Sequence, residues 1–241
     1  MNQPSYIDWR NARMTELLAK EKYDFGDLCD IVTILRGEGG CPWDREQDHH
    51  SIRKGMIEEC YEVVEAIDRD DAALLREELG DVLLQIVFHA DMEKDAGIFD
   101  IDDVANDECI KMIHRHPHVF GQVKAETSEQ VLVNWEAIKT EEKQRVSLAD
   151  QLEAIPPMLP ALMRAQKVSK KTDAGADMAK DILLDDIVKS IEALKTTEEA
   201  EGQKQLMGDI LFDLTTACRK LGIEAEEALT AATERVIEEV K

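Results

Sequence analysis

The chain has 241 residues, of which 44% are hydrophobic and 34% charged, a composition typical of a globular protein rather than a disordered one. The formal net charge of −23 repels phosphate backbones and anionic lipid head groups, so neither nucleic acid nor a membrane is an expected partner. The N-terminus has no apolar signal core, no run is long enough to span a membrane, and the five cysteines form no CxxC pair, which together predict a cytoplasmic protein.

Helical periodicity extends along most of the chain, and no segment alternates as a strand does. We predict an N-terminal extension over residues 1–24, helical only around 14–22, and then a helix that ends at the glycines of 37–40. Further helices are predicted over about 49–68, 72–96, 100–114, 128–144, 161–171, 180–196 and 201–221, with a last one from 224 onward. The fold class is therefore expected to be all-α, an antiparallel helical bundle.

The proline-rich segment 155–160 suggests a boundary between two domains, 25–150 and 151–241. The words Leu-Gly-Asp-Val-Leu (79–83) and Met-Gly-Asp-Ile-Leu (207–211) echo each other, and both predicted helices end at a glycine. This echo predicts two related helical units in tandem.

Two pairs of acids are spaced three apart on consecutive predicted helices: Glu59 with Glu62, and Glu78 with Asp81. Each pair lies on one helical face, and a short turn near 69–71 should pack the two helices antiparallel, with residue 59 near 81 and 62 near 78. The expected core faces border these acids. They comprise Met56, Ile57, Cys60, Val64 and Ile67 on the first helix and Leu75, Leu79, Val82, Leu83, Ile86, Val87 and Ala90 on the second.

Four partly desolvated carboxylates cannot all stay ionised without cations, and oxygen ligands favour Mg²⁺, with Mn²⁺ as a substitute. Such a site typically bridges substrate phosphates. The competing interpretation is a solvated helix face in an acidic protein, but an acid inside the apolar run ELGDVLLQIV is hard to explain in that way. A di-iron bundle would need a Glu-x-x-His unit on each of two helices, and none follows Glu59 or Glu78.

The acidic motif resembles that of the MazG-like nucleoside triphosphate pyrophosphohydrolases. The words GCPWDREQ (40–47), HRHPHVFG (114–121), NWEAIKTEE (134–142) and LPALMRAQK (159–167) strengthen the resemblance and occur in order over about residues 28–170. The resemblance implies a homodimeric, Mg²⁺-dependent enzyme in which activated water attacks the α-phosphorus, releasing a nucleoside monophosphate and pyrophosphate. It implies Glu59, Glu62, Glu78 and Asp81 as metal ligands and Glu58 as an outer acid or water-orienting base.

Basic and aromatic side chains are further candidates for binding the triphosphate. Lys54 is a candidate, and Lys111 and Arg115, four apart on one face, match the family's phosphate-contacting helix. Trp43 is a candidate for stacking on a nucleobase, or else it plugs its loop onto the bundle.

The second unit departs from the family pattern. Alignment of Gly208-Asp209 with Gly80-Asp81 places Leu206 where Glu78 stands, and alignment of Ile191-Glu192 with Tyr61-Glu62 places Lys189 where Glu59 stands. Residues 151–241 are therefore expected to be a silent unit for packing, dimerisation or regulation. Two alternatives to the general enzyme remain open: a pyrophosphohydrolase for one nucleotide, such as dCTP, dUTP or phosphoribosyl-ATP, and a non-catalytic helical interaction module.

Overall fold

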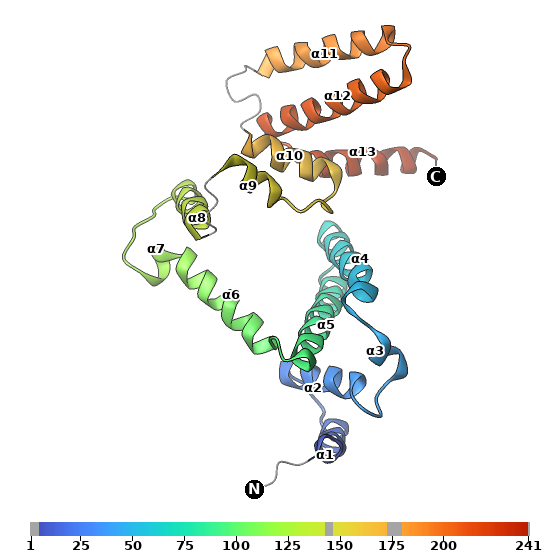
Figure 1. The fold of residues 1–241 in the computed structure, drawn as a ribbon, viewed down its shortest axis with the longest axis vertical. Helices are drawn as coiled ribbons and strands as arrows, with labels where there is room; N and C mark the ends of the chain where they lie inside the picture. The colour runs from blue at the N-terminus through green and yellow to red at the C-terminus, as the bar shows by residue number, and fades with distance from the viewer. Residues whose placement is uncertain (1–4, 143–146, 173–179, 241) are drawn as a thin grey trace. The chain divides into compact units, whose positions relative to one another are not determined.

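The computed structural model describes residues 5–142, 147–172 and 180–240, and within these ranges every regular element is a helix (Figure 1). The all-α expectation is therefore confirmed for the described residues. The helices are α1 (Tyr6–Leu18), α2 (Phe25–Arg36), α3 (Pro42–Glu46), α4 (His49–Asp68), α5 (Ala72–Ala96), α6 (Ile101–Arg115), α7 (Pro117–Phe120), α8 (Ser128–Glu142), α9 (Leu148–Glu153), α10 (Ala161–Lys171), α11 (Lys180–Thr196), α12 (Ala200–Lys220) and α13 (Ala225–Val240).

The helix ends carry the capping signals that the sequence offers. Asp48 and Asp100 form capping boxes at the starts of α4 and α6, and Asp71 accepts from two backbone N–H groups at the start of α5. Gly97 ends α5 with φ 72°, a left-handed conformation that glycine adopts without steric cost.

The chain divides into two compact units, residues 1–131 and 132–241. The predicted extension over 1–24, catalytic domain over 25–150 and silent second unit over 151–241 stay predictions. Each unit has its own apolar cluster. In the first, Val32, Ile52, Val87, Phe88 and Met92 join α2, α4 and α5, and in the second, Leu183, Ile187, Ile210 and Ala217 join α11 and α12.

The N-terminal helix α1 starts and ends earlier than the predicted helical stretch 14–22, since it covers Tyr6–Leu18, and it docks on α2. Arg13 donates to Asp27 and, at 2.6 Å, to Asp30, while Lys20 reaches the same Asp27, which is 0% exposed. Tyr6 adds a hydrogen bond to the carbonyl oxygen of Thr33. Polar contacts to one buried carboxylate thus hold α1 in place, and hydrophobic periodicity does not reveal such contacts.

The predicted core face of α4 is wrong for the single chain. Ile57, Val64 and Ile67 are 46%, 49% and 54% exposed, Cys60 is also exposed and Met56 is half-buried. The buried residues of α4 are instead Ile52 and Ala66. On α5, Leu79 and Leu83 are exposed, whereas Val87 and Ala90 are buried as predicted. The reason is that the main neighbour of α4 is α5, so the rest of its apolar surface has no covering element within the first unit.

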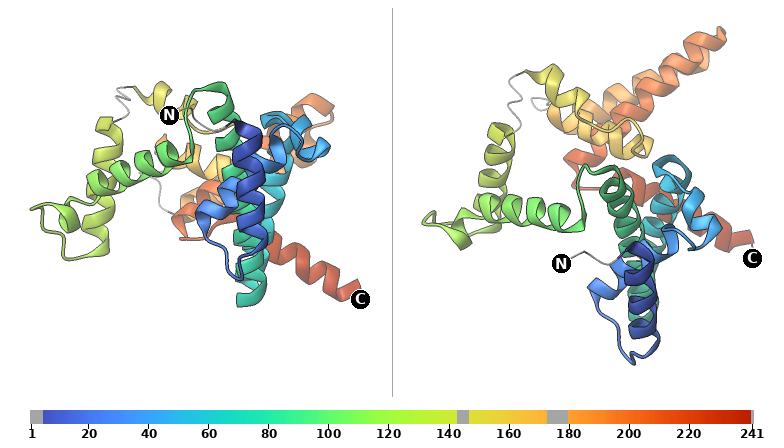
Figure 2. Two further views of the ribbon diagram at one scale, coloured as in Figure 1. Left: turned by 90° about the horizontal axis from the view of Figure 1, so that it is seen from below. Right: turned by 60° about the horizontal axis from the view of Figure 1, so that its bottom comes forward.

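In the second unit, α11 and α12 form an antiparallel pair, and α10 packs on α12 (Figure 2). Buried Gln166 on α10 donates to the carbonyl oxygen of Ile223 and accepts from the N–H of Ala225, which ties the turn before α13 to α10. No described helix is long and apolar enough to cross a membrane.

Candidate metal centre

A three-residue turn makes α4 and α5 an antiparallel pair. Asp70 sits in it at φ 52°, a conformation that aspartate tolerates better than most residues, and the side chain of Asp71 accepts from Ala73 N and Leu74 N at 3.0 Å. The turn thereby fixes which residues of the two helices face each other.

The facing residues include the acids of the two sequence pairs. One carboxylate oxygen each of Glu59, Glu78 and Asp81 lies within 4.8 Å of the others, and these are the one group of three such potential ligands among the described residues. Glu78 is buried, while Glu59 and Asp81 are half-buried. Oxygen atoms at this separation can share one divalent cation after small side-chain rotations.

Glu62 is exposed but belongs electrostatically to the same cluster. Burial first, and then the charge of Glu62, raises the pKa of both Glu59 and Glu78 above the ordinary value. Asp81 raises both further. Burial and the neighbouring negative charges thus disfavour the ionised forms of Glu59 and Glu78, and a bound cation would reverse this penalty.

The remaining predicted site residues lie on the surface or pair with neighbours on their own helix. Glu58 is exposed and paired with Lys54 at 2.7 Å, so each neutralises the other on the surface of α4. Trp43 on α3 is 63% exposed and therefore does not plug the loop onto the first unit. Lys111 pairs with Glu108 on its own helix.

Lys111 and Arg115 lie in the last two turns of α6. This helix meets α5 at the Gly97 turn and then diverges from the α4–α5 pair (Figures 1 and 2), so a single chain does not place these cations over the acids. Their role in phosphate binding stays a prediction, as do the roles of the acids, Lys54 and Trp43.

Sequence reasoning missed a second polar cluster between the start of α4 and the later part of α5. His49 Nδ1 and His89 Nδ1 are 2.7 Å apart, the two rings are stacked, and His49 Nε2 is 2.7 Å from Glu93. Burial, and then the charge of His49, lowers the pKa of His89. The two histidines are 40 positions apart in the chain, so spacing alone gave no signal.

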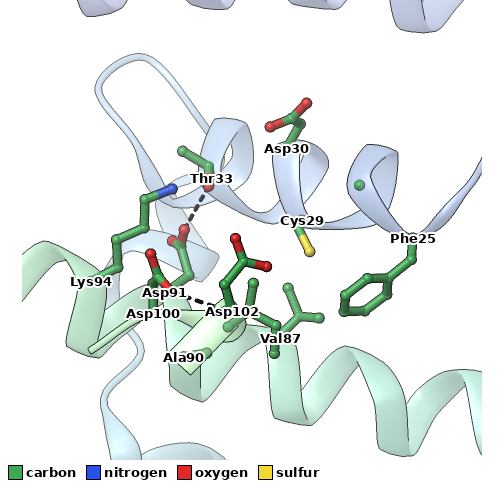
Figure 3. A pocket seen from close by; sticks show the side chains of 12 residues that line it. Phe25, Cys29, Asp30, Thr33, Val87, Ala90, Asp91, Lys94, Asp100 and Asp102 are labelled. Carbon is green, nitrogen blue, oxygen red and sulfur yellow. Dashed lines mark hydrogen bonds between the residues drawn. The ribbon is translucent and has the colours of Figure 1, made fainter. Parts of the chain in front are cut away.

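A cavity of about 290 Å³ also escaped the sequence analysis, because it forms where α2, α5 and the start of α6 meet. Figure 3 shows Cys29 and Thr33 on one side and Asp91 and Lys94 on another, with Asp102 from α6. Thr33 donates to Asp91 at 2.5 Å, and Arg36 also pairs with this aspartate. None of the four clustered acids lines this cavity.

A helical pair that gathers carboxylates in this way is typical of all-α proteins with acid-rich helix–helix seams, whose oxygen ligands can hold a divalent cation. The family model of the MazG nucleotide pyrophosphohydrolase domain matches residues 47–120, which contain all four acids. The chain is 37% identical to the nucleoside triphosphate pyrophosphohydrolase/pyrophosphatase MazG of Thermotoga maritima, over 90% of this chain and 84% of that protein. It is 42% identical to the nucleoside triphosphate pyrophosphohydrolase of Escherichia coli, over 86% of this chain and 82% of that protein.

This chain belongs to the MazG nucleotide pyrophosphohydrolase family, and the resemblance expected from its motifs is thereby confirmed. The Bacillus subtilis protein YabN is also 42% identical over 88% of this chain, but the chain spans only 45% of the length of YabN.

Proposed function

We propose that this chain hydrolyses nucleoside triphosphates to the monophosphate and pyrophosphate in a reaction that requires Mg²⁺. The observation that carries the proposal is the meeting of Glu59, Glu78 and Asp81 within 4.8 Å, inside the segment that matches the MazG domain. The pyrophosphohydrolase names of the relatives in Thermotoga maritima and Escherichia coli support the reaction class.

The donor set fits a magnesium ion. The ligands are all carboxylate oxygens, no cysteine or histidine belongs to the group, and the pKa values of Glu59 and Glu78 are raised by burial and then by neighbouring negative charge. Glu59, Glu62, Glu78 and Asp81 would hold the ion, which supplies charge neutralisation for phosphate and activation of water.

The protein side chains then have distinct tasks in this proposal. The four acids fix the cation at the seam, and the buried position of Glu78 limits how far that carboxylate can move. Glu58 is a candidate for orienting the attacking water once Lys54 turns toward a phosphate instead. Trp43 would stack on the base, its exposed ring needing no rearrangement to do so.

A second copy of the chain is part of the proposal. The exposed apolar side chains of α4, namely Ile57, Tyr61, Val64 and Ile67, form a stripe at helical spacing, and no residue of α6 is buried in the single chain. Pairing of two copies through these faces would cover the stripe and could bring Lys111 and Arg115 of one copy to the acids of the other.

The second unit is proposed to be a related but catalytically silent copy. Its antiparallel helices α11 and α12 are joined by a three-residue turn, as α4 and α5 are, and Gly222 follows α12 at φ 71°. Two of its acids are compensated locally: Asp186 pairs with Lys189 and Glu192 with Lys195, each at 2.7 Å. Among the described residues, the α11–α12 pair brings no three acidic ligand atoms together as the α4–α5 seam does.

The test of the reaction is a panel of ribo- and deoxyribonucleoside triphosphates, with and without Mg²⁺, in which both products are identified. The proposal expects monophosphate and pyrophosphate in equal amounts and no turnover after chelation. Release of orthophosphate and a nucleoside diphosphate, or turnover that persists in chelator, would contradict it. Turnover of a single nucleotide would instead favour the dedicated enzyme for that nucleotide.

The two-chain site is tested by mixing two inactive variants, Asp81→Asn and the double variant Lys111→Ala with Arg115→Ala. If cations and acids of one site come from different chains, mixed dimers regain one intact site, and about a quarter of the wild-type activity returns. Equal inactivity before and after mixing would contradict the shared site.

A further inference from the structure

Gly55 and Gln85 face each other across the α4–α5 seam, in the layer next to the acids. Gly55 lies four residues before Glu59 on α4, and Gln85 lies four residues after Asp81 on α5. Residues four apart on a helix share a face, so Gln85 stands directly beneath Asp81 along the seam. On the other side of this layer, Ile52 and Phe88 belong to the buried apolar cluster.

The glycine makes room for the amide. A Cβ atom at position 55 would stand 3.0 Å from Gln85 Nε2, closer than ordinary van der Waals contact. Glycine is otherwise a poor choice in the interior of a helix, and Gly55 has no left-handed backbone conformation that would require it. The space for the Gln85 side chain is therefore the physical reason for glycine at this position.

The amide oxygen of Gln85 is buried and has no hydrogen-bond donor among the residues that the structure describes. By helical spacing, the layers on either side of Gln85 hold apolar Ile52 and Phe88 and the carboxylates of Glu59 and Asp81, and an ionised carboxylate only accepts hydrogen bonds. A buried acceptor without a donor is costly, so such a group in a native structure calls for a donor from outside the chain.

We infer that Gln85 is a positioning residue for the cation site, whose amide oxygen accepts a hydrogen bond from a water molecule in the hydration shell of the bound divalent ion. This inference rests on the proposed cation site. Mg²⁺ bound by carboxylates usually keeps several of its waters, and each of these is a strong donor that needs an acceptor. Acceptors in this outer layer orient the ion and its ligands without touching the ion.

The experiment measures Mn²⁺ binding in the absence of nucleotide, by titration with electron paramagnetic resonance detection of the free ion. Gln85→Met keeps the length of the side chain but removes the acceptor, and Gln85→Glu keeps an acceptor oxygen. Gly55→Ala leaves Gln85 in place but pushes its amide away from the seam. Gly208→Ala is the matched control, because a Cβ atom at this helical glycine of α12 would meet no other atom within 4 Å.

The expected result is weaker Mn²⁺ binding in Gln85→Met and in Gly55→Ala, with a dissociation constant about tenfold larger than that of the wild type. Gln85→Glu should bind at least as tightly as the wild type, and Gly208→Ala should not differ from it. The same two weakened variants should require more Mg²⁺ for half-maximal turnover. Circular dichroism and thermal unfolding confirm that each variant is folded.

Wild-type Mn²⁺ affinity in folded Gln85→Met would overturn the inference, since the amide would then only fill the space above Gly55. The failure of the proposed function looks different: Asp81→Asn would bind Mn²⁺ as the wild type does. If Asp81→Asn loses the ion and Gln85→Met does not, the cation site stands and Gln85 has no part in it.

Discussion

Glu78, which is 9% exposed, faces Glu62 across the α4–α5 seam, and the charge of Glu62 follows burial as a cause of its raised pKa. Two acids from different helices thus oppose each other where an apolar pair would stabilise the bundle. An arrangement that lowers the stability of the cation-free protein in this way is common at functional sites, where the residues that function requires are not the ones that stabilise the fold most.

Glu78→Gln should raise the melting temperature of the cation-free protein at pH 7, because it removes one charge from a repulsive group. The same variant should lose most of the further increase that Mg²⁺ gives to the wild type. Differential scanning calorimetry with and without Mg²⁺ measures both effects. Glu77→Gln, at the exposed neighbouring position, is the control and should retain the Mg²⁺ response. A lower melting temperature for cation-free Glu78→Gln would contradict the repulsion.

Asp81→Asn should reduce pyrophosphate release at least a hundredfold, the effect expected when a group at the reacting centre is lost. Asp209→Asn changes the corresponding residue of the second Gly-Asp word and should leave the rate within about twofold of the wild type, because the second unit is proposed to be catalytically silent. A coupled pyrophosphate assay on both variants makes the comparison. A large loss in Asp209→Asn would mean that the second unit takes part in catalysis.

The His49–His89–Glu93 cluster should make the protein less stable in mild acid. The pKa of His89 in the folded protein lies below its ordinary value of 6.5, so the unfolded chain binds more protons as the pH falls below about 6.5. The free energy of unfolding should therefore decrease from pH 7.5 to 5.5, and the decrease should be smaller in His89→Gln. Urea denaturation at the two pH values measures this, with exposed His50→Gln as control. Equal decreases in wild type and His89→Gln would refute the assignment.

Asp27 should hold α1 on α2 until strongly acidic pH. The hydrogen bond from Lys20, then the backbone N–H of Asp24 and the Arg13 guanidinium, lowers its pKa to about 2. Because the folded pKa is below the ordinary 3.8, this stabilisation is complete above pH 3.8 and is lost as the pH falls toward 2. Asp27→Asn should lower the melting temperature at pH 7 by about 2–8 °C, whereas exposed Glu21→Gln should not. Hydrogen exchange in α1 should accelerate in Asp27→Asn, and unchanged exchange there would count against the docking role.

The helices of both units were predictable because their boundaries are encoded locally. Asp48, Asp71 and Asp100 supply caps, Gly97 and Gly222 supply stops, and the predicted ranges 49–68 and 72–96 match α4 and α5. The short helices α3, α7 and α9 were not predicted, since elements of four to six residues are too short to show a period.

The sequence also predicted that the two acid pairs face each other, because a three-residue turn between two helices allows only antiparallel packing. The exposure of Ile57 and Ile67 could not be predicted, since a hydrophobic stripe looks the same in the sequence whether it packs against its own chain or against another one. The unsatisfied oxygen of Gln85 and the histidine pair depend on side-chain contacts between helices, which no spacing rule encodes.

The turn at residues 69–71 also limits how this sequence can change length. Each residue added to a helix rotates everything beyond it by about 100°, so a single insertion between Glu62 and Glu78 inside either helix would turn one acid pair away from the seam. The sixteen-residue interval between these two positions must therefore keep its length for the acids to face each other. Deletions and insertions over the course of evolution should accumulate on either side of it and leave the interval itself intact.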